Sequence, residues 1–106
     1  MKIHHLQDTV RGWFIGSFCG ALFHSDAVEV AVKHYRRFDW GQRHYHALST
    51  EFTVVVSGEL LFGNKRLSAG DIAEVAAHEE ADLLALEDSV TVVVKLPAVL
   101  GDKYYT

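Results

Sequence analysis

The stretch G-Q-R-H-Y-H-A-L-S-T-E-F-T-V-V-V-S-G, from Gly41 to Gly58, decides the fold prediction for this chain. Residues two apart in a β-strand point to the same face, so the H-Y-H triplet places His44 and His46 on one side. The next four residues allow a short turn before Glu51 begins another strand and brings a carboxylate back towards the imidazoles. Zinc, nickel, iron and manganese accept such a mixed donor set, so the stretch predicts a divalent metal site. The alternative is a half-exposed surface pair of histidines.

The spacing of these residues resembles the first sequence motif of the cupin superfamily: H-x-H, four residues, Glu, six residues, Gly. His44, His46, Glu51 and Gly58 fill this motif without a gap. The resemblance spans about residues 28 to 96 and is greatest with small single-domain cupins that end in a K-x-P-x-x-x-G-D-K-Y tail, here Lys95 to Tyr104. It implies an all-β fold, the RmlC-like double-stranded β-helix or cupin jelly-roll barrel, as a single domain over residues 1–106.

The second cupin motif matches less well. Gly70 to Ile72 resemble its start, but the position eleven residues after the glycine, where cupins usually have a metal-binding histidine, is Ala81. His78, three residues earlier, is the expected fourth metal ligand if its loop turns inward; the alternative is a solvent-facing loop residue. Asp82 is a weaker substitute, because strand alternation places it on the face opposite Ala81. Four protein ligands, three ligands or no metal therefore stay open.

The rest of the chain has the pattern of short strands and turns that is typical of an all-β domain. Alternation of Val28, Val30 and Val32 with Glu29, Ala31 and Lys33 predicts a half-buried strand over Val28 to Tyr35. Ser57-Gly58 is typical of a two-residue hairpin between strands Phe52 to Val56 and Glu59 to Phe62. Val90 to Leu96 is rich in β-branched residues and predicts a buried strand. Turns every eight to twelve residues favour a sandwich or barrel.

The segment Asp71 to Leu86 favours a helix by propensity alone, with Asp71 as N-cap and Glu74 completing a capping box. The family resemblance instead implies two strands, Asp71 to Val75 and Asp82 to Leu86, around a loop. We prefer the strands, because tertiary packing often overrides weak propensity.

The apolar run Gly12 to Phe23 superficially resembles the core of a signal peptide, but it holds three glycines, has no convincing cleavage site and is too short to cross a membrane. We expect Trp13, Ile15 and Phe18 to form an N-terminal edge strand instead. Cys19 is the single cysteine, which excludes an intrachain disulfide and fits a reducing cytosol. We expect Cys19 to be buried and inert, and the protein to be cytoplasmic with no membrane partner.

Composition limits the class of protein. With 106 residues, 49% of them hydrophobic, the chain can form one core. A net charge of -4 argues against a nucleic-acid partner. Basic residues gather around the proposed site, either as a positive rim for an anionic small molecule or as a solvated strand edge; they are Lys33, His34, Arg36, Arg37, Arg43 and His44.

These patterns predict a small metal-binding cupin that acts on a small polar molecule, sugar-like or anionic. His44, His46, Glu51 and His78 are the expected metal ligands, with Glu51 alternatively a catalytic general base, and the metal is Zn, Fe, Mn or Ni. Tyr35 and Arg43 are the expected substrate-binding residues, and Trp40 and Tyr45 are further candidates for stacking on a sugar.

The resemblance implies metal-dependent isomerases or epimerases, lyases and dioxygenases, and it also implies binding proteins with no catalysis. One alternative is therefore a non-catalytic small-molecule-binding module that has lost metal chemistry. A third interpretation is a structural interaction protein, with the tail from Leu96 to Tyr105 as a dimer surface. Single-domain cupins commonly pair, so we expect a homodimer.

Overall fold

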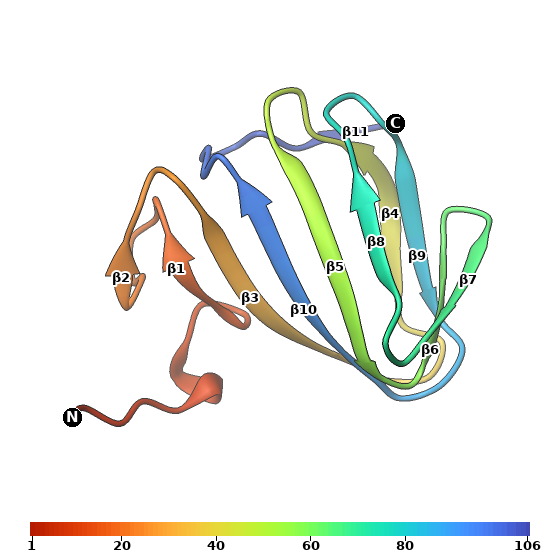
Figure 1. The fold of residues 1–106 in the computed structure, drawn as a ribbon, viewed down its shortest axis with the longest axis horizontal. Helices are drawn as coiled ribbons and strands as arrows, with labels where there is room; N and C mark the ends of the chain where they lie inside the picture. The colour runs from red at the N-terminus through yellow and green to blue at the C-terminus, as the bar shows by residue number, and fades with distance from the viewer.

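The computed structural model describes residues 1–106 as two facing β-sheets, preceded by one short 3-10 turn, η1 (Leu6–Asp8) (Figure 1). The first sheet has the strand order β2-β1-β3-β10-β5-β8, with β1 (Trp13–Gly16), β2 (Phe23–His24), β3 (Glu29–Tyr35), β5 (Thr50–Ser57), β8 (Ile72–Val75) and β10 (Ser89–Leu96). The second has the order β11-β4-β9-β6-β7, with β4 (Trp40–Tyr45), β6 (Glu59–Phe62), β7 (Lys65–Ser68), β9 (Ala81–Ala85) and β11 (Tyr104–Tyr105). The all-β prediction is confirmed, although hydrogen bonds do not close the two sheets into a continuous barrel. No helix has the length and apolar character that crossing a bilayer requires.

The segment from residue 71 to 86 forms two strands, β8 and β9, so a helix prediction from local propensity would be wrong. β8 pairs with β5, and β9 lies between β4 and β6. A tight turn separates the two strands: the Glu79 carboxylate accepts the Ala76 N–H at 3.0 Å, and His78 has a φ of +69°. Pairing on both sides of β9 outweighs the local preference for helix.

The N-terminal strand is present and lies one position from the sheet edge. β1 pairs antiparallel with β3 and parallel with the two-residue β2, which forms the edge. Cys19 follows β1 in a turn and is exposed, so the expectation that it is buried is wrong. Gly20, the residue after Cys19, has a φ of +94°, a conformation that favours glycine in this turn.

In strand β3 the apolar valines face outward and polar side chains face the interior, the opposite of what hydrophobicity alone would assign. In β3, Glu29 and Ala31 are buried, whereas Val30 and Val32 are only half-buried on the outer face. Cross-strand partners share a face, and Ala31 lies opposite Val93, while Val32 lies opposite Val92. The inner face therefore carries polar residues, and the outer face of the six-stranded sheet is apolar.

The apolar core occupies one end of the space between the sheets. Val55, Leu60 and Ala85 are each no more than 1% exposed and form its centre. Along β5 the inward side chains are Glu51, Thr53 and Val55, so this interior changes from polar to apolar over five residues. A dry core closes one end and leaves the other end for a polar site.

Gly58 carries the chain from one sheet to the other, so the predicted hairpin at Ser57-Gly58 is wrong. β5 belongs to the six-stranded sheet and β6 to the five-stranded sheet, and the two do not pair. Gly58 has a φ of +88°, and a Cβ at this position would overlap the Ser89 hydroxyl and the Asp88 carbonyl oxygen. The corner therefore requires glycine both for its backbone conformation and for the close approach of Ser89.

Replacing Gly58 by alanine is expected to lower the free energy of unfolding by about 3 kcal/mol, from left-handed backbone strain plus overpacking. Gly63→Ala is the matched control, because Gly63 also has positive φ, +62°, but nothing lies within 4 Å of its Cβ position. The control is expected to cost about 1 kcal/mol, from backbone strain alone. Urea unfolding of the two variants measures the difference, and equal losses would show that the Ser89 contact does not matter.

Candidate functional site

A cavity of about 630 Å³ lies between the two sheets and contains most of the predicted site. Its wall includes three of the four predicted metal ligands and one predicted substrate-binding residue: His44, His46, Glu51 and Tyr35. His44 is on β4 and His46 follows directly after it, whereas Glu51 is on β5 of the opposite sheet. The H-x-H spacing therefore places both imidazoles on the cavity side, as strand alternation predicts.

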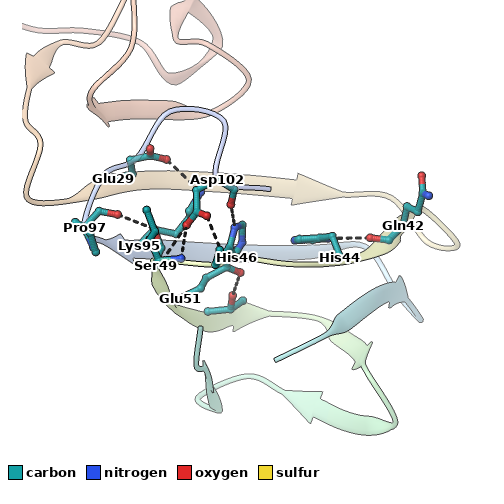
Figure 2. Close-up of polar contacts among 12 residues, drawn as sticks. Glu29, Gln42, His44, His46, Ser49, Glu51, Lys95, Pro97 and Asp102 are labelled. Carbon is teal, nitrogen blue, oxygen red and sulfur yellow. Dashed lines mark hydrogen bonds and ion pairs between the residues drawn. The ribbon is translucent and has the colours of Figure 1, made fainter. Parts of the chain in front are cut away.

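His46 is fixed by contacts at both ring nitrogens (Figure 2). Its Nδ1 donates to the backbone carbonyl of Asp102, and its Nε2 lies 3.1 Å from Oε2 of Glu51. The imidazole is 4% exposed, so neither contact is shared with bulk solvent. With Nδ1 bonded to the carbonyl, Nε2 is the ring nitrogen that faces the cavity carboxylate and that would bind a metal ion in the neutral ring.

Asp102 holds the loop that carries His46. Its carboxylate accepts three backbone N–H groups, from Ala47 at 2.9 Å, Leu48 at 3.0 Å and Ser49 at 2.9 Å. Burial raises the pKa of this carboxyl, but the three N–H donors outweigh burial and leave the pKa below its usual value. The same residue thus fixes both the backbone after His46 and the orientation of the imidazole.

His44 is arranged in a similar way. Its Nδ1 lies 2.8 Å from the carbonyl oxygen of Gln42, to which it donates, so Nε2 of the neutral ring keeps a free lone pair. Burial lowers the pKa of His44, and this outweighs the opposing hydrogen bond to the Gln42 carbonyl. The net shift favours the neutral ring, which is the form that can coordinate a metal. The His44 and His46 ring centres are 5.1 Å apart.

Glu51 is ionised within a mostly buried setting. Burial raises the pKa of Glu51. Hydrogen bonds from His46 and Thr53 and the charge of Lys95 lower the pKa by more than burial raises it, so the net shift is downward. Lys95 is itself paired with Glu29, their charged atoms 3.5 Å apart and both side chains nearly buried. A structured line of charges therefore runs along the inner face of the six-stranded sheet beside Glu51.

The donor chemistry of His44, His46 and Glu51 fits a divalent metal. Two ligands each about 2.1 Å from an ion lie about 3.0–3.4 Å apart for octahedral or tetrahedral angles, close to the 3.1 Å between His46 and Glu51. As the side chains stand, however, no group of three or more His, Cys, Asp or Glu residues is arranged to hold an ion. Binding would therefore require the His46–Glu51 hydrogen bond to break and His44 to adjust.

The structure does not bring His78 to the cavity. His78 is exposed and its ring lies 5.8 Å from that of Tyr45, which points to the opposite face of β4 from His44. The positive φ of the turn directs His78 over the outside of the sheet, so the prediction of an inward swing is not met. The donor set is reduced to His44, His46 and Glu51.

Three other predicted contacts also lie outside the cavity wall. Arg43 points away from it and pairs with Glu80 at 3.0 Å, with more than half of its side chain exposed. Trp40 is 72% exposed, and Tyr45 stacks on Tyr104 at 5.2 Å. Of the proposed substrate contacts only Tyr35 lines the cavity, and burial followed by the Glu51 charge raises its pKa.

Ala81 occupies the cavity-facing position next to His44. The two residues are direct partners in the β4–β9 pairing, and both line the cavity. The motif spacing from Gly70, which predicts a metal ligand at residue 81, therefore corresponds to a position on the cavity wall. In this chain that position carries only the methyl group of alanine.

Lys95, Glu29 and Asp102 are functional candidates that the sequence did not single out. Lys95 and Glu29 lie in strands where alternation alone suggests solvent exposure for charged residues. Asp102 belongs to the Gly-Asp-Lys-Tyr tail, whose resemblance was the available signal, but its contacts reach back more than fifty residues and are not readable from local pattern.

Comparisons with known proteins give no match to a protein-family model and none to a curated protein. Solved structures do match. KdgF from Halomonas sp. has a TM-score of 0.67 at 25% identity, covering 72% of this chain and 75% of that chain. An RmlC-like cupin from Shewanella frigidimarina has a TM-score of 0.64 at 20% identity, covering 71% of this chain and 70% of that chain. This chain has the cupin fold.

Cupins similar to this chain include a metal-dependent enzyme that acts on a small molecule. Oxalate decarboxylase from Bacillus subtilis, which has Mn(II) centres, matches with a TM-score of 0.65 at 12% identity, covering 76% of this chain and 24% of that chain. Identity this low supports the fold alone, because different functions occur on one fold.

Asp102→Asn is expected to lower the free energy of unfolding at pH 7 by about 2–3 kcal/mol, because an amide cannot accept three N–H groups and loses the charge. The folded pKa of Asp102 is lowered, so its contribution is present above about pH 4 and disappears as the pH falls through the folded pKa. Urea unfolding of both proteins from pH 7 to pH 3 should show the gap narrowing. Asp82→Asn, at an exposed aspartate, is the control and should change stability by no more than about 0.5 kcal/mol. A gap that does not depend on pH would contradict the role of the carboxylate.

Proposed function

We propose that this chain is a small metal-binding cupin that acts on a small polar molecule held in the cavity. His44, His46 and Glu51 are the proposed ligands of one divalent ion, which is Zn, Fe, Mn or Ni. The observation that supports this most strongly is the position of His46: a buried ring, oriented through Nδ1 by a backbone carbonyl, with Nε2 3.1 Å from a carboxylate. Metal-ligating histidines typically have such an outer hydrogen bond.

The lowered pKa of Glu51 favours a ligand role over a general-base role. A general base works best when its pKa is near the working pH, and a carboxylate held well below that value is a weak base. The same ionised carboxylate is a good metal ligand. A bound ion would supply Lewis acidity to an oxygen of the substrate. Tyr35 is the proposed polar contact of the substrate on the opposite wall, while Arg43 is left out because it faces solvent.

A non-catalytic binding module is the second candidate. It is favoured by the methyl group of Ala81 in the ligand position beside His44 and by the lack of three donors arranged around one point. In this function the cavity holds a small molecule through its polar wall, and the imidazoles act as hydrogen-bonding groups. Metal content separates the two candidates.

The proposal includes a homodimer formed through the outer face of the six-stranded sheet. Its outward side chains are mostly apolar, and two of them are more than half exposed, Val56 at 54% and Ile72 at 62%. A second copy would cover these side chains and relieve the cost of leaving an apolar sheet face in water.

Protein purified without a histidine tag and dialysed against Zn²⁺ or Mn²⁺ is expected to retain about one ion per chain. The His44→Ala, His46→Ala double variant should retain none, because two of three donors are lost. His78→Ala is the control and should retain the ion, since His78 lies outside the cavity. Elemental analysis measures all three. Absence of metal in the native protein would favour the binding module, and loss of metal in His78→Ala would overturn the ligand set.

Ala81→His is expected to tighten metal binding at least roughly tenfold, because it adds an imidazole beside His44 on the cavity wall. Leu83→His is the comparison, since Leu83 also lines the cavity but pairs with Gly41, farther along β4. Competition with a chromogenic chelator measures both affinities. Equal affinities in Ala81→His and the native protein would show that the metal does not sit beside His44.

A further inference from the structure

Lys33 is an inward-facing lysine that forms no ion pair. It lies on β3 opposite Thr91, which is fully buried, and it lines the cavity. Its Nζ donates to the carbonyl oxygen of Arg11 at 2.7 Å and lies 5.2 Å from the centre of the Trp13 ring. Lys33 is half-buried and its hydrogen-bond partner is a neutral carbonyl, so its positive charge is not neutralised within the chain.

Lys95 shows how the fold treats a lysine of purely structural role. Lys95 also faces inward and lies over the Trp13 ring, at 5.6 Å, but its ammonium is paired with the Glu29 carboxylate. The Trp13 ring thus contacts two ammonium groups: that of Lys95, which is paired with a carboxylate, and that of Lys33, which is not. Among the other acidic groups of the wall, Glu51 is engaged with His46 and Asp102 with three backbone N–H groups. Glu79 accepts the Ala76 N–H, and Asp82 is exposed.

Lys33 lies near other cationic side chains. Burial, followed by the charges of Arg11 and Lys103, lowers its pKa from 10.5 to about 8 against the opposing effect of Glu51. Arg11 and Lys103 also line the cavity, and neither forms an ion pair. An anion beside Lys33 would meet the charges of Lys33, Arg11 and Lys103, with Glu51 as the opposing charge.

We propose that Lys33, with Arg11 and Trp13 beside it, is a subsite for the carboxylate of a small hydroxy acid. This inference rests on the proposed function in one respect, because it makes the small polar molecule anionic and gives it a direction. The carboxylate is held at β1 and β3, and the hydroxyl-bearing remainder extends past Lys95 towards Glu51 and the imidazoles. An ammonium donating to a carboxylate is a charge-assisted hydrogen bond, which is stronger than one between neutral groups.

Gluconate and glucitol test this subsite, because they have the same carbon chain and differ in a carboxylate against a neutral hydroxymethyl group. Calorimetric titration of the native protein is expected to detect gluconate and to show at least tenfold weaker binding of glucitol. Lys33→Met should weaken gluconate binding about tenfold or more, and Lys33→Arg should restore most of it. Lys65→Met, at an exposed lysine on β7, should leave binding unchanged.

The thermal midpoint of each variant shows whether it folds. Lys33→Met is expected to change the midpoint little, because the hydrogen bond to Arg11 that it loses is offset by removal of a partly desolvated charge, and the length of the side chain is kept. Equal binding of gluconate and glucitol, unchanged gluconate binding in Lys33→Met, or no gluconate binding by the native protein would each overturn the subsite. Metal content, measured on the same samples, separates this inference from the proposed function. Metal-free protein that binds gluconate through Lys33 keeps the subsite and rejects the metal centre, whereas metal-loaded protein indifferent to Lys33→Met does the reverse.

Discussion

The contacts of Asp102 determine the geometry on which the candidate site depends. A carboxylate near the C-terminal end takes three backbone N–H groups from residues 47–49, and its own carbonyl accepts Nδ1 of His46. Without these bonds, the N–H donors would lack partners. Leaving a buried donor without a partner costs more free energy than a typical hydrogen bond contributes. The tail must therefore dock before His46 can face Glu51. β11 completes the docking by pairing Tyr104 and Tyr105 with β4.

The interior that results is polar at one end, and this reverses the usual rule for half-buried strands. Alternation in β3 gives the correct strand and the correct period, but not the face that points inward, because valines and charged residues alternate with equal regularity. Ala31 is fully buried and Glu29 nearly so, whereas Val30 and Val32 face outward. A chain that keeps a cavity between its sheets places polar groups there, and its apolar strand residues are left for the outer surface.

The sequence predicted the parts of the site that depend on local spacing and missed those that depend on long-range contacts. Strand alternation predicts that His44 and His46 share a face, and both line the cavity, as does Glu51 from the same motif; their role as ligands stays a prediction. His78 could not be placed, because one turn residue with positive φ sets the direction of its loop. The Ser57-Gly58 corner has the composition of a hairpin, and only the proximity of Ser89 from another strand shows that the chain changes sheets there.

Charge pairing inside the cavity separates structural from functional groups. Each buried ion costs free energy unless a partner or several hydrogen bonds compensate for lost water. The Glu29–Lys95 pair and the Asp102 cluster meet this condition within the chain, and Glu51 meets it through His46, Thr53 and Lys95. The Lys33 ammonium is half-buried and is held by the Arg11 carbonyl oxygen and the Trp13 ring, but no carboxylate neutralises it. An uncompensated positive charge on the cavity wall is a feature that an anionic ligand would complement.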